Sequence, residues 1–280
     1  MDAAFVTRFA PSPTGYLHKG HAFSALTAFH AARDAGGRLL LRIEDIDAAR
    51  RRPEYEAAIL EDLGWLGLEW ETPVRRQSDH IDDYQAALDQ LRDRGLLYRC
   101  FRTRQEVLAA IASAPHGPVE AFAGAPLPPE AEADRLDAGE PFAWRLSLAA
   151  AREALGDAWD RLGYADMDEG LLRASPEIVG DVVLARKGLG VAYHLASVVD
   201  DALQGVTHVI RGEDLREAPH VQVPLQALLG LSTPVYRHHR LIVGPDGRRL
   251  AKRDKAQTLR ELRAGGATPK DLRLELGFAE

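Results

Sequence analysis

The sequence predicts a doubly wound α/β domain, and two observations support this prediction. Residues 4–45 have the pattern of a strand, a loop, a helix and a second strand, which is the length of a parallel crossover. Apolar runs that suit further strands and a helix return at 178–186, 190–203 and 205–215. The composition of 46% hydrophobic and 28% charged residues is that of a water-soluble globular protein, which excludes a disordered, collagenous or membrane-embedded chain.

The first elements follow one another in order. Residues 4–9 form the first expected strand, and residues 21–36 have helical apolar spacing that ends in two glycines. Residues 38–45 form an apolar strand that finishes in acids. Helices are expected around 53–63 and 79–95, which continues the alternation of strands and helices.

The pattern loosens in the middle of the 280-residue chain, which exceeds the length of one average domain. Residues 110–133 have the Ala/Pro/Gly composition of a mobile loop and belong to an expected insertion. A strand-like segment at 240–244 and a turn at 245–247 precede a small helical module. The expected division is 1–99, first half of the α/β domain; 100–189, an inserted subdomain; 190–236, second half of the α/β domain; and 237–280, a basic loop with a short helical module.

Charge is distributed unevenly along the chain. The net charge of −7 and a pI near 5.8 argue against nonspecific nucleic-acid binding by the chain as a whole. Residues 237–273, however, hold eleven Lys or Arg against four acids, a pattern that suits a polyanion held by one part of the molecule. A solvated helical face rich in arginine explains this charge pattern equally well.

The single cysteine and the amino-terminal residues indicate the cellular compartment. One cysteine, Cys100, excludes a disulfide framework and any metal site made of several thiolates. The amino-terminal residues lack a basic stretch followed by an apolar core, and no run reaches the length of a membrane span. We therefore expect a cytoplasmic protein without membrane contact.

Two histidines stand where a phosphate would bind. The segment RFAPSPTGYLHKGH places His18 and His21 three residues apart, on one face of the first helical turn. A helix amino terminus favours phosphate, and imidazoles add donors. Surface or capping histidines would have the same spacing. Far along the chain, Lys252 in RRLAKRDKA could deliver positive charge to phosphates as a transition state forms.

Four segments together resemble a known family. RFAPSPTGYLHKGH, LRIEDID, VIRGEDL and RLAKRDKA are similar, in order and spacing, to the catalytic domain of class I glutamyl-tRNA synthetases, with HKGH in place of HIGH and RLAKR in place of KMSKS. The resemblance implies a Rossmann-type (HUP-like) α/β fold with an inserted subdomain and a short carboxy-terminal helical module similar to a stem-contact module. Because the chain stops soon after the KMSKS-like loop, it looks like the truncated glutamyl-queuosine tRNA(Asp) synthetases.

That resemblance implies an activity and partners. The expected enzyme is an ATP-dependent ligase that converts L-glutamate to glutamyl-adenylate without needing tRNA. It then transfers glutamate to queuosine in the anticodon loop of tRNA(Asp). ATP is a substrate, Mg²⁺ is expected to compensate the leaving pyrophosphate, and a monomer is expected.

The resemblance also implies the site residues. His18, His21 and Lys252 match the positions that bind the phosphates of ATP and act in catalysis. A second set matches the glutamate pocket. Arg211 is the leading candidate for the side-chain carboxylate, followed by Arg8, and Glu44 matches the ligand of the α-ammonium. The remaining positions of the pocket are Ser12 and Tyr193.

The sequence departs from the family pattern at a few positions. Ala251 replaces the usual Ser of the mobile loop, and Arg249 occupies its first basic position, which removes a hydroxyl contact to phosphate. Ser197 stands where full synthetases often have Asn.

Zinc is not expected in the insertion. Many members bind structural Zn²⁺ there through a CxC pair, a Tyr and a further Cys, and tetrahedral Zn²⁺ needs four such ligands. This chain offers Cys100 and then Arg102, and His116 is too isolated to complete a site. We expect Cys100 to be a small buried hydrophobic residue.

Three alternatives remain open at this point. A glutamyl-tRNA synthetase paralogue would charge a tRNA 3′ end, and its activation step would depend on tRNA. A weakly catalytic module could hold glutamate or tRNA. A small-molecule adenylyltransferase shares the phosphate chemistry of the histidine pair but leaves Arg8, Glu44 and Arg211 together without explanation.

Overall fold

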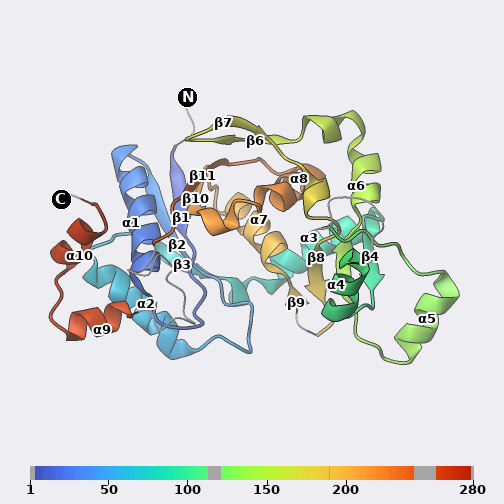
Figure 1. Cartoon of the computed structure of the whole chain (residues 1–280), viewed down its shortest axis with the longest axis horizontal. Coiled ribbons are helices and arrows are strands. Elements are labelled where there is room, and N and C mark those ends of the chain that lie inside the picture. The colour runs from blue at the N-terminus through green and yellow to red at the C-terminus, as the bar shows by residue number, and fades with distance from the viewer. Residues whose placement is uncertain (1–3, 113–120, 189, 243–256, 279–280) are drawn as a thin grey trace. The chain divides into compact units, whose positions relative to one another are not determined.

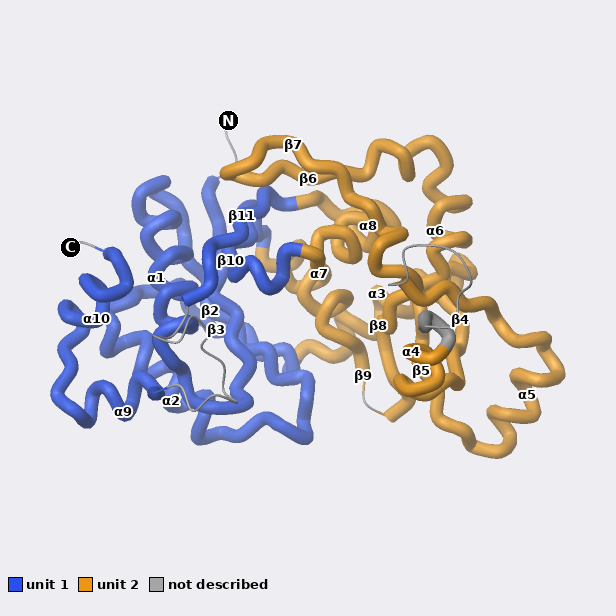
Figure 2. Tube along the Cα trace, viewed as in Figure 1, with its two compact units in different colours: residues 1–79, 205–216, 234–280 blue, residues 80–204, 217–233 orange. Residues whose placement is uncertain are grey.

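The computed structural model of the chain describes residues 4–112, 121–188, 190–242 and 257–278 (Figure 1). The chain divides into two compact units, shown in blue and orange in Figure 2. Unit 1 comprises Met1–Asp79, Gly205–Arg216 and Pro234–Glu280, and unit 2 comprises His80–Gln204 and Glu217–Thr233. The division at residues 100, 190 and 237 expected from the sequence stays a prediction.

Unit 1 is built on a parallel sheet. Its strands are β1 (Val6–Phe9), β2 (Arg38–Ile43), β3 (Glu71–Arg76), β10 (His208–Gly212) and β11 (Val235–His239). β1 pairs with β2, β2 with β3 and β10 with β11, all in parallel. Thr207, just before β10, donates its backbone N–H to the carbonyl of Val6 (2.9 Å), which places β10 beside β1. The described strands of unit 1 thus follow the order β3-β2-β1-β10-β11.

That strand order has a functional consequence. The chain leaves β1 toward β2 on one side and reaches β10 on the other side only after residues 80–204 of unit 2. Ligands of doubly wound sheets bind at such a switch point, beyond the carboxyl ends of the strands. The predicted α/β fold class is confirmed, and the switch point lies between β1 and β10.

Helix α1 (Lys19–Asp34) covers one face of this sheet. Phe9, Leu41 and Ile210, each on a different strand, pack in one core with residues of α1 such as Leu26. The remaining helices of unit 1 are α2 (Pro53–Trp65), α9 (Leu259–Ala264) and α10 (Pro269–Glu275), with short 3-10 turns at Gln77–Asp79 and Glu213–Leu215. All three helices contribute leucines to the same core. These helices therefore share one apolar core with a single face of the sheet.

Unit 2 contains antiparallel strands and helices. Strands β4 (Leu97–Cys100), β5 (Ala143–Leu146), β8 (Val183–Arg186) and β9 (Gly190–Val191) form an antiparallel sheet, and β6 (Gly163–Asp166) and β7 (Gly170–Arg173) form a hairpin. The helices are α3 (Ile81–Asp93), α4 (Arg104–Ala112), α5 (Pro129–Asp137), α6 (Leu148–Leu155), α7 (Tyr193–Leu203) and α8 (Pro219–Leu229), with 3-10 turns at Gly156–Arg161 and Pro176–Ile178.

Three expectations about elements were wrong in part. The run at 178–186 contains a strand, but β8 belongs to the antiparallel sheet, because a short apolar run does not reveal the direction of its partner. The expected loop at 110–133 contains the last turn of α4 and the start of α5, where a proline and two glutamates begin the helix. The strand expected at 240–244 lies earlier, at β11, and residues 240–242 are not in a strand.

Elsewhere the predicted elements are confirmed. Of the three apolar runs expected to supply strands and a helix, the run at 190–203 contains helix α7, which lies in unit 2, and the run at 205–215 contains β10 of the parallel sheet. The turn at 245–247, His116, Arg249, Ala251 and Lys252 lie outside the described residues. Within the described ranges, no helix is both long enough and apolar enough to cross a membrane.

Candidate active site

His18 and His21 lie side by side at the start of α1. His18 is the N-cap residue, with extended backbone angles, and its Nδ1 accepts a hydrogen bond from the backbone N–H of Gly20 (3.1 Å). Nδ1 of His21 in turn accepts from the backbone N–H of His18 (3.2 Å). The ring centroids are 3.9 Å apart. This reciprocal capping box fixes both rings at the carboxyl end of β1.

The capping bonds also assign the tautomers. A neutral imidazole carries one proton, so a ring whose Nδ1 accepts must carry its proton on Nε2. In both His18 and His21 the proton of the neutral ring is therefore on Nε2. Two adjacent N–H donors at a helix amino terminus suit the oxygen atoms of a phosphate.

The side chains of Arg8, Arg42 and Arg211 share one face of the parallel sheet. Phe9, Leu41, Ile43 and Ile210, their neighbours along the strands, lie in the core with α1. Since successive side chains of a strand alternate between faces, the three arginines point to the face opposite α1. All three are buried, with exposed fractions of 4%, 0% and 5%.

Three of the predicted residues lie at the carboxyl ends of adjacent strands. Arg8 is the penultimate residue of β1, and Arg211 is the penultimate residue of β10. Glu44 directly follows β2, and its backbone N–H bonds to the carbonyl of Pro11 (3.0 Å) in the loop after β1. The strand order β2-β1-β10 therefore brings two guanidinium groups and a carboxylate together at the switch point.

Two residues of this site were missed by the sequence analysis. Arg42 Nη2 lies 3.1 Å from Glu44 Oε1, and both side chains are nearly inaccessible. Its signal in the sequence was a charged residue within the apolar run 39–43. His238 of β11 accepts a hydrogen bond from Arg211 Nε (3.2 Å), and no apolar pattern marks that strand.

The segments on either side of residues 243–256 contact α1 and the loop before it. His239 Nε2 accepts from Ser24 Oγ (3.0 Å), while Nδ1 donates to the carbonyl of Arg240 (2.9 Å). Burial lowers the pKa of His239, which agrees with this neutral ring. On the other side, Leu259 N–H donates to the carbonyl of Leu17 (2.8 Å), next to His18. The described residues on both sides of 243–256 therefore contact α1 or the residue before His18.

The two remaining pocket residues are less constrained. Ser12 is exposed in the loop after β1, and its carbonyl accepts from Thr14 N–H (2.8 Å). Tyr193 begins α7, in unit 2, and the buried Ser197 lies one turn further along the same helix. The roles of Ser12 and Tyr193 stay predictions.

The surroundings of Cys100 do not suit zinc. Cys100 is buried among Tyr98, Val107 and Phe122, as expected for a small hydrophobic residue. The guanidinium of Arg102, the position of the second cysteine of a CxC pair, lies over the ring of Phe122 (5.7 Å). In the part of the chain that the structure describes, no three His, Cys, Asp or Glu side chains are grouped as a metal would require. The expected absence of zinc stays a prediction.

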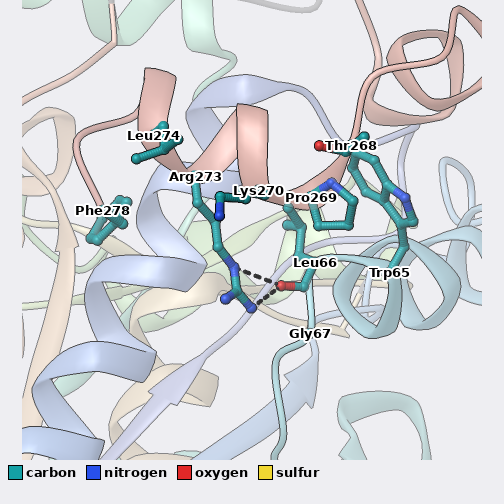
Figure 3. Close-up of a pocket in the computed structure, with 9 residues that line it drawn as sticks. All are labelled: Trp65, Leu66, Gly67, Thr268, Pro269, Lys270, Arg273, Leu274 and Phe278. Atoms are coloured by element: carbon teal, nitrogen blue, oxygen red, sulfur yellow. Dashed lines mark hydrogen bonds between the residues drawn. The ribbon is translucent and has the colours of Figure 1, made fainter. Parts of the chain in front are cut away.

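A separate surface pocket lies beside α10 in unit 1 (Figure 3). It has a volume of about 370 Å³ and contains none of the predicted site residues. Arg273 reaches across it and donates from Nε to the carbonyl of Leu66 (3.0 Å), which ties α10 to the end of α2. The lining residues are Trp65, Leu66, Gly67, Thr268, Pro269, Lys270, Arg273, Leu274 and Phe278.

Comparison with known proteins places this geometry in a family. The model of the catalytic domain of class I tRNA synthetases (E and Q) matches residues 4–274. The glutamyl-Q tRNA(Asp) synthetase of Rhodobacter capsulatus is 50% identical over 289 aligned positions, which cover 98% of this chain and 100% of that protein. The glutamate–tRNA ligase 2 of a Ruegeria species is 39% identical, and the match covers 94% of this chain but 58% of the ligase.

A solved structure agrees with these sequence matches. The crystal structure of a glutamate tRNA ligase from Elizabethkingia meningosepticum, in complex with its amino acid, matches with a TM-score of 0.77 at 28% identity. The match covers 96% of this chain and 59% of that chain. The chain belongs to the class I tRNA synthetases (E and Q), and it is an ATP-dependent ligase. The predicted resemblance to the glutamyl-queuosine tRNA(Asp) synthetases is confirmed by the identity to the Rhodobacter protein.

Proposed function

We propose that the chain activates L-glutamate with ATP, without needing tRNA, and transfers the glutamate to the queuosine base in the anticodon loop of tRNA(Asp). The observation that carries this proposal is the placement of Arg8, Glu44 and Arg211 at the carboxyl ends of three adjacent strands. Glutamate has two carboxylates and one ammonium, so its pocket needs guanidinium groups and an acid in close proximity.

The roles of these residues follow from charge. Arg211 binds the side-chain carboxylate of glutamate, and Arg8 adds positive charge beside it. Glu44 accepts hydrogen bonds from the α-ammonium, and its ion pair with Arg42 holds the carboxylate in place. Ser12 and Tyr193 complete the pocket.

His18, His21 and Lys252 act on ATP. The two histidines donate from Nε2–H to phosphate oxygens, in the tautomers that the capping bonds require. An α-carboxylate oxygen of glutamate attacks the α-phosphorus, the bond to the bridging oxygen breaks, and pyrophosphate leaves. Lys252 stabilises the charge that develops in this step. A queuosine hydroxyl then attacks the carbonyl carbon of the adenylate and releases its proton to solvent, the bond from that carbon to the phosphate oxygen breaks, and AMP leaves.

The proposed reaction also requires a metal ion and an RNA partner. Mg²⁺, when bound with ATP, compensates the charge of the leaving pyrophosphate, and we assign no protein ligand to it. The basic segment 237–273 and the inserted region are the proposed contacts with the tRNA. We also propose a monomeric protein in the cytoplasm, with the catalytic domain divided at residues 100, 190 and 237.

Glutamate-dependent ATP–pyrophosphate exchange tests the activation step. Purified protein is assayed with and without tRNA, with aspartate and glutamine as controls. Exchange with glutamate in the absence of tRNA is the expected result. Exchange that appears only when tRNA is added would indicate a glutamyl-tRNA synthetase paralogue. No exchange in either case would leave a glutamate-binding or tRNA-binding module.

Transfer is tested with labelled glutamate and tRNA(Asp). We expect label to enter tRNA(Asp) that contains queuosine, including molecules that lack the 3′-terminal adenosine. The same tRNA with guanosine in place of queuosine should stay unlabelled. Labelling that requires the terminal adenosine would assign the activity to the 3′ end.

A further inference from the structure

The neighbour of Arg211 in the sheet is a histidine. β10 and β11 are parallel, and their register pairs Arg211 with His238, so both side chains lie on the same face. Arg211 Nε donates a hydrogen bond to His238 Nε2 across 3.2 Å. The guanidinium carbon of Arg211 also lies 5.2 Å from the ring centroid of Tyr236, which is two residues before His238 on the same strand.

These two contacts restrict the guanidinium in different ways. The buried ring of Tyr236 supports the group as a whole through a cation–π contact. The hydrogen bond at Nε fixes the direction in which the plane of the guanidinium points. Because Nε is engaged by His238, a carboxylate must approach Arg211 through its terminal Nη groups.

The chemistry of His238 suits this role. An imidazole nitrogen that accepts from a guanidinium must be unprotonated, so the ring is neutral and its proton is on Nδ1. A neutral acceptor orients the arginine without cancelling its charge, whereas a carboxylate in the same place would compete with the carboxylate of the substrate. His238 itself therefore does not neutralise the positive charge of Arg211.

We propose that His238 is a positioning residue that holds the guanidinium of Arg211 in the orientation that binds the side-chain carboxylate of glutamate. It thereby contributes to the selection of glutamate over the neutral glutamine. This inference rests on the role proposed above for Arg211. The backbone pairing of β10 with β11 holds the strands together without this side-chain contact, so its loss should affect substrate binding more than folding.

Two variants of His238 test the proposal in the exchange assay. His238→Leu removes the acceptor, and His238→Gln retains one, since the amide oxygen of Gln reaches about as far as Nε2. We expect His238→Leu to raise the KM for glutamate roughly ten- to a hundredfold, with the KM for ATP changed less than about twofold. His238→Gln should restore most of the affinity for glutamate.

A matched control is His208→Leu. His208 begins β10, three residues before Arg211 and therefore on the opposite face of the strand, and it stacks on Phe5 (3.9 Å between ring centroids). Its replacement should leave the KM for glutamate unchanged. If His238→Leu folds poorly, His238→Asn takes its place, because the shorter amide is polar but does not reach Nε of Arg211. A higher KM for glutamate in the Asn variant than in the Gln variant would then support the proposal, and equal KM values would contradict it.

Arg211→Ala separates this inference from the proposed function. If Arg211→Ala leaves the KM for glutamate and the preference over glutamine unchanged, the role of Arg211 itself is wrong. If Arg211→Ala raises the KM for glutamate but His238→Leu does not, the role proposed for Arg211 stands and the role proposed for His238 is wrong. If each single variant raises the KM for glutamate, the double variant Arg211→Ala/His238→Leu should have nearly the same KM as Arg211→Ala, because the two residues act through one contact. Equal losses of affinity in the Leu and Gln variants, with equal losses of thermal stability, would show a structural role only.

Discussion

Arg42 and Glu44 form a buried ion pair at the end of β2, with Nη2 and Oε1 3.1 Å apart. The side chain of Arg42 is fully buried, and that of Glu44 is 9% exposed. Residues two apart on a strand lie on the same face, so the backbone holds both groups beside each other. The pair joins the sheet to the carboxylate that is proposed to bind the α-ammonium of glutamate.

Removal of the guanidinium of Arg42 should affect both the stability of the fold and the binding of glutamate. We expect Arg42→Met to lower the free energy of unfolding by about 3 kcal/mol, because a buried carboxylate loses an opposite charge. The KM for glutamate should rise, since Glu44 is no longer held in one orientation. Urea denaturation and pyrophosphate exchange measure the two effects.

The control for this prediction lies on the same strand. Arg38 pairs with Glu71 at 2.9 Å, but both side chains are about half exposed. Arg38→Met should therefore lower the free energy of unfolding by less than about 1 kcal/mol and leave the KM for glutamate unchanged. Equal effects of the two substitutions would contradict the special role of the buried pair.

Gly20 lies between the two histidines, and its lack of a side chain leaves room for the ring of His18. A Cβ atom at Gly20 would lie 3.0 Å from Cε1 and 3.1 Å from Nδ1 of His18. We expect Gly20→Ala to displace this ring and slow glutamate activation by roughly ten- to a hundredfold. Because alanine favours helix, stability should not fall. Gly64→Ala in α2, where a Cβ meets no neighbouring atom, should leave activation unchanged.

The sequence predicted the parallel sheet and the histidine pair because both depend on local patterns. The apolar run of β2 and the spacing of His18 and His21 are found in the structure with only small changes at the element ends. The Arg8, Glu44 and Arg211 positions could be inferred from a family resemblance, and strand order explains their proximity. Their roles in binding stay predictions.

Other features depend on contacts between distant segments. Arg42 lies in an apolar run, where the sequence alone does not show that the guanidinium is fully buried. His238 acquires its place only when β11 pairs with β10, and the sequence of that strand has no apolar alternation. Short strands such as β8 have no local signal for the sheet that they join.

Asp62 should make stability depend on pH. It is 1% exposed on α2, and neither carboxylate oxygen has a hydrogen-bond partner among the described residues. Burial raises its pKa to about 6 from an ordinary value of 3.8. The folded state therefore binds the proton of Asp62 more tightly than the unfolded state does. The contribution of this proton to the free energy of unfolding is complete below pH 3.8 and is lost as the pH rises through 6.

Asp62→Asn removes this dependence. We expect the variant to be more stable than the parent chain at pH 8, by up to about 3 kcal/mol, and the difference to shrink toward pH 4. Urea denaturation at several pH values measures it. Glu61→Gln, at the adjacent exposed position that pairs with Arg263 (2.8 Å), should show little change with pH. A difference that grows toward acid pH would contradict the burial of an ionised Asp62.

Asp181 is a buried carboxylate that connects three segments of unit 2. Its Oδ2 accepts from the hydroxyl of Tyr98 and from Gly124 N–H, both at 2.8 Å, and its Oδ1 accepts from Leu148 N–H at 2.9 Å. Burial and the bond to Asp181 raise the pKa of Tyr98, so its hydroxyl stays protonated and donates. These bonds join the segments around the cluster that contains Cys100 and Phe122.

Asp181→Asn should therefore destabilise the protein by about 3 kcal/mol, because the amide group would face two donors that lose their acceptor. Asp160→Asn, at a position with a 66% exposed side chain, is the control and should change little. A chelator should leave the melting temperature of the parent chain unchanged, and metal analysis of the purified protein should find no stoichiometric zinc. A melting temperature that falls on chelation and recovers with added Zn²⁺ would show that the insertion binds the metal after all, through ligands outside the described residues.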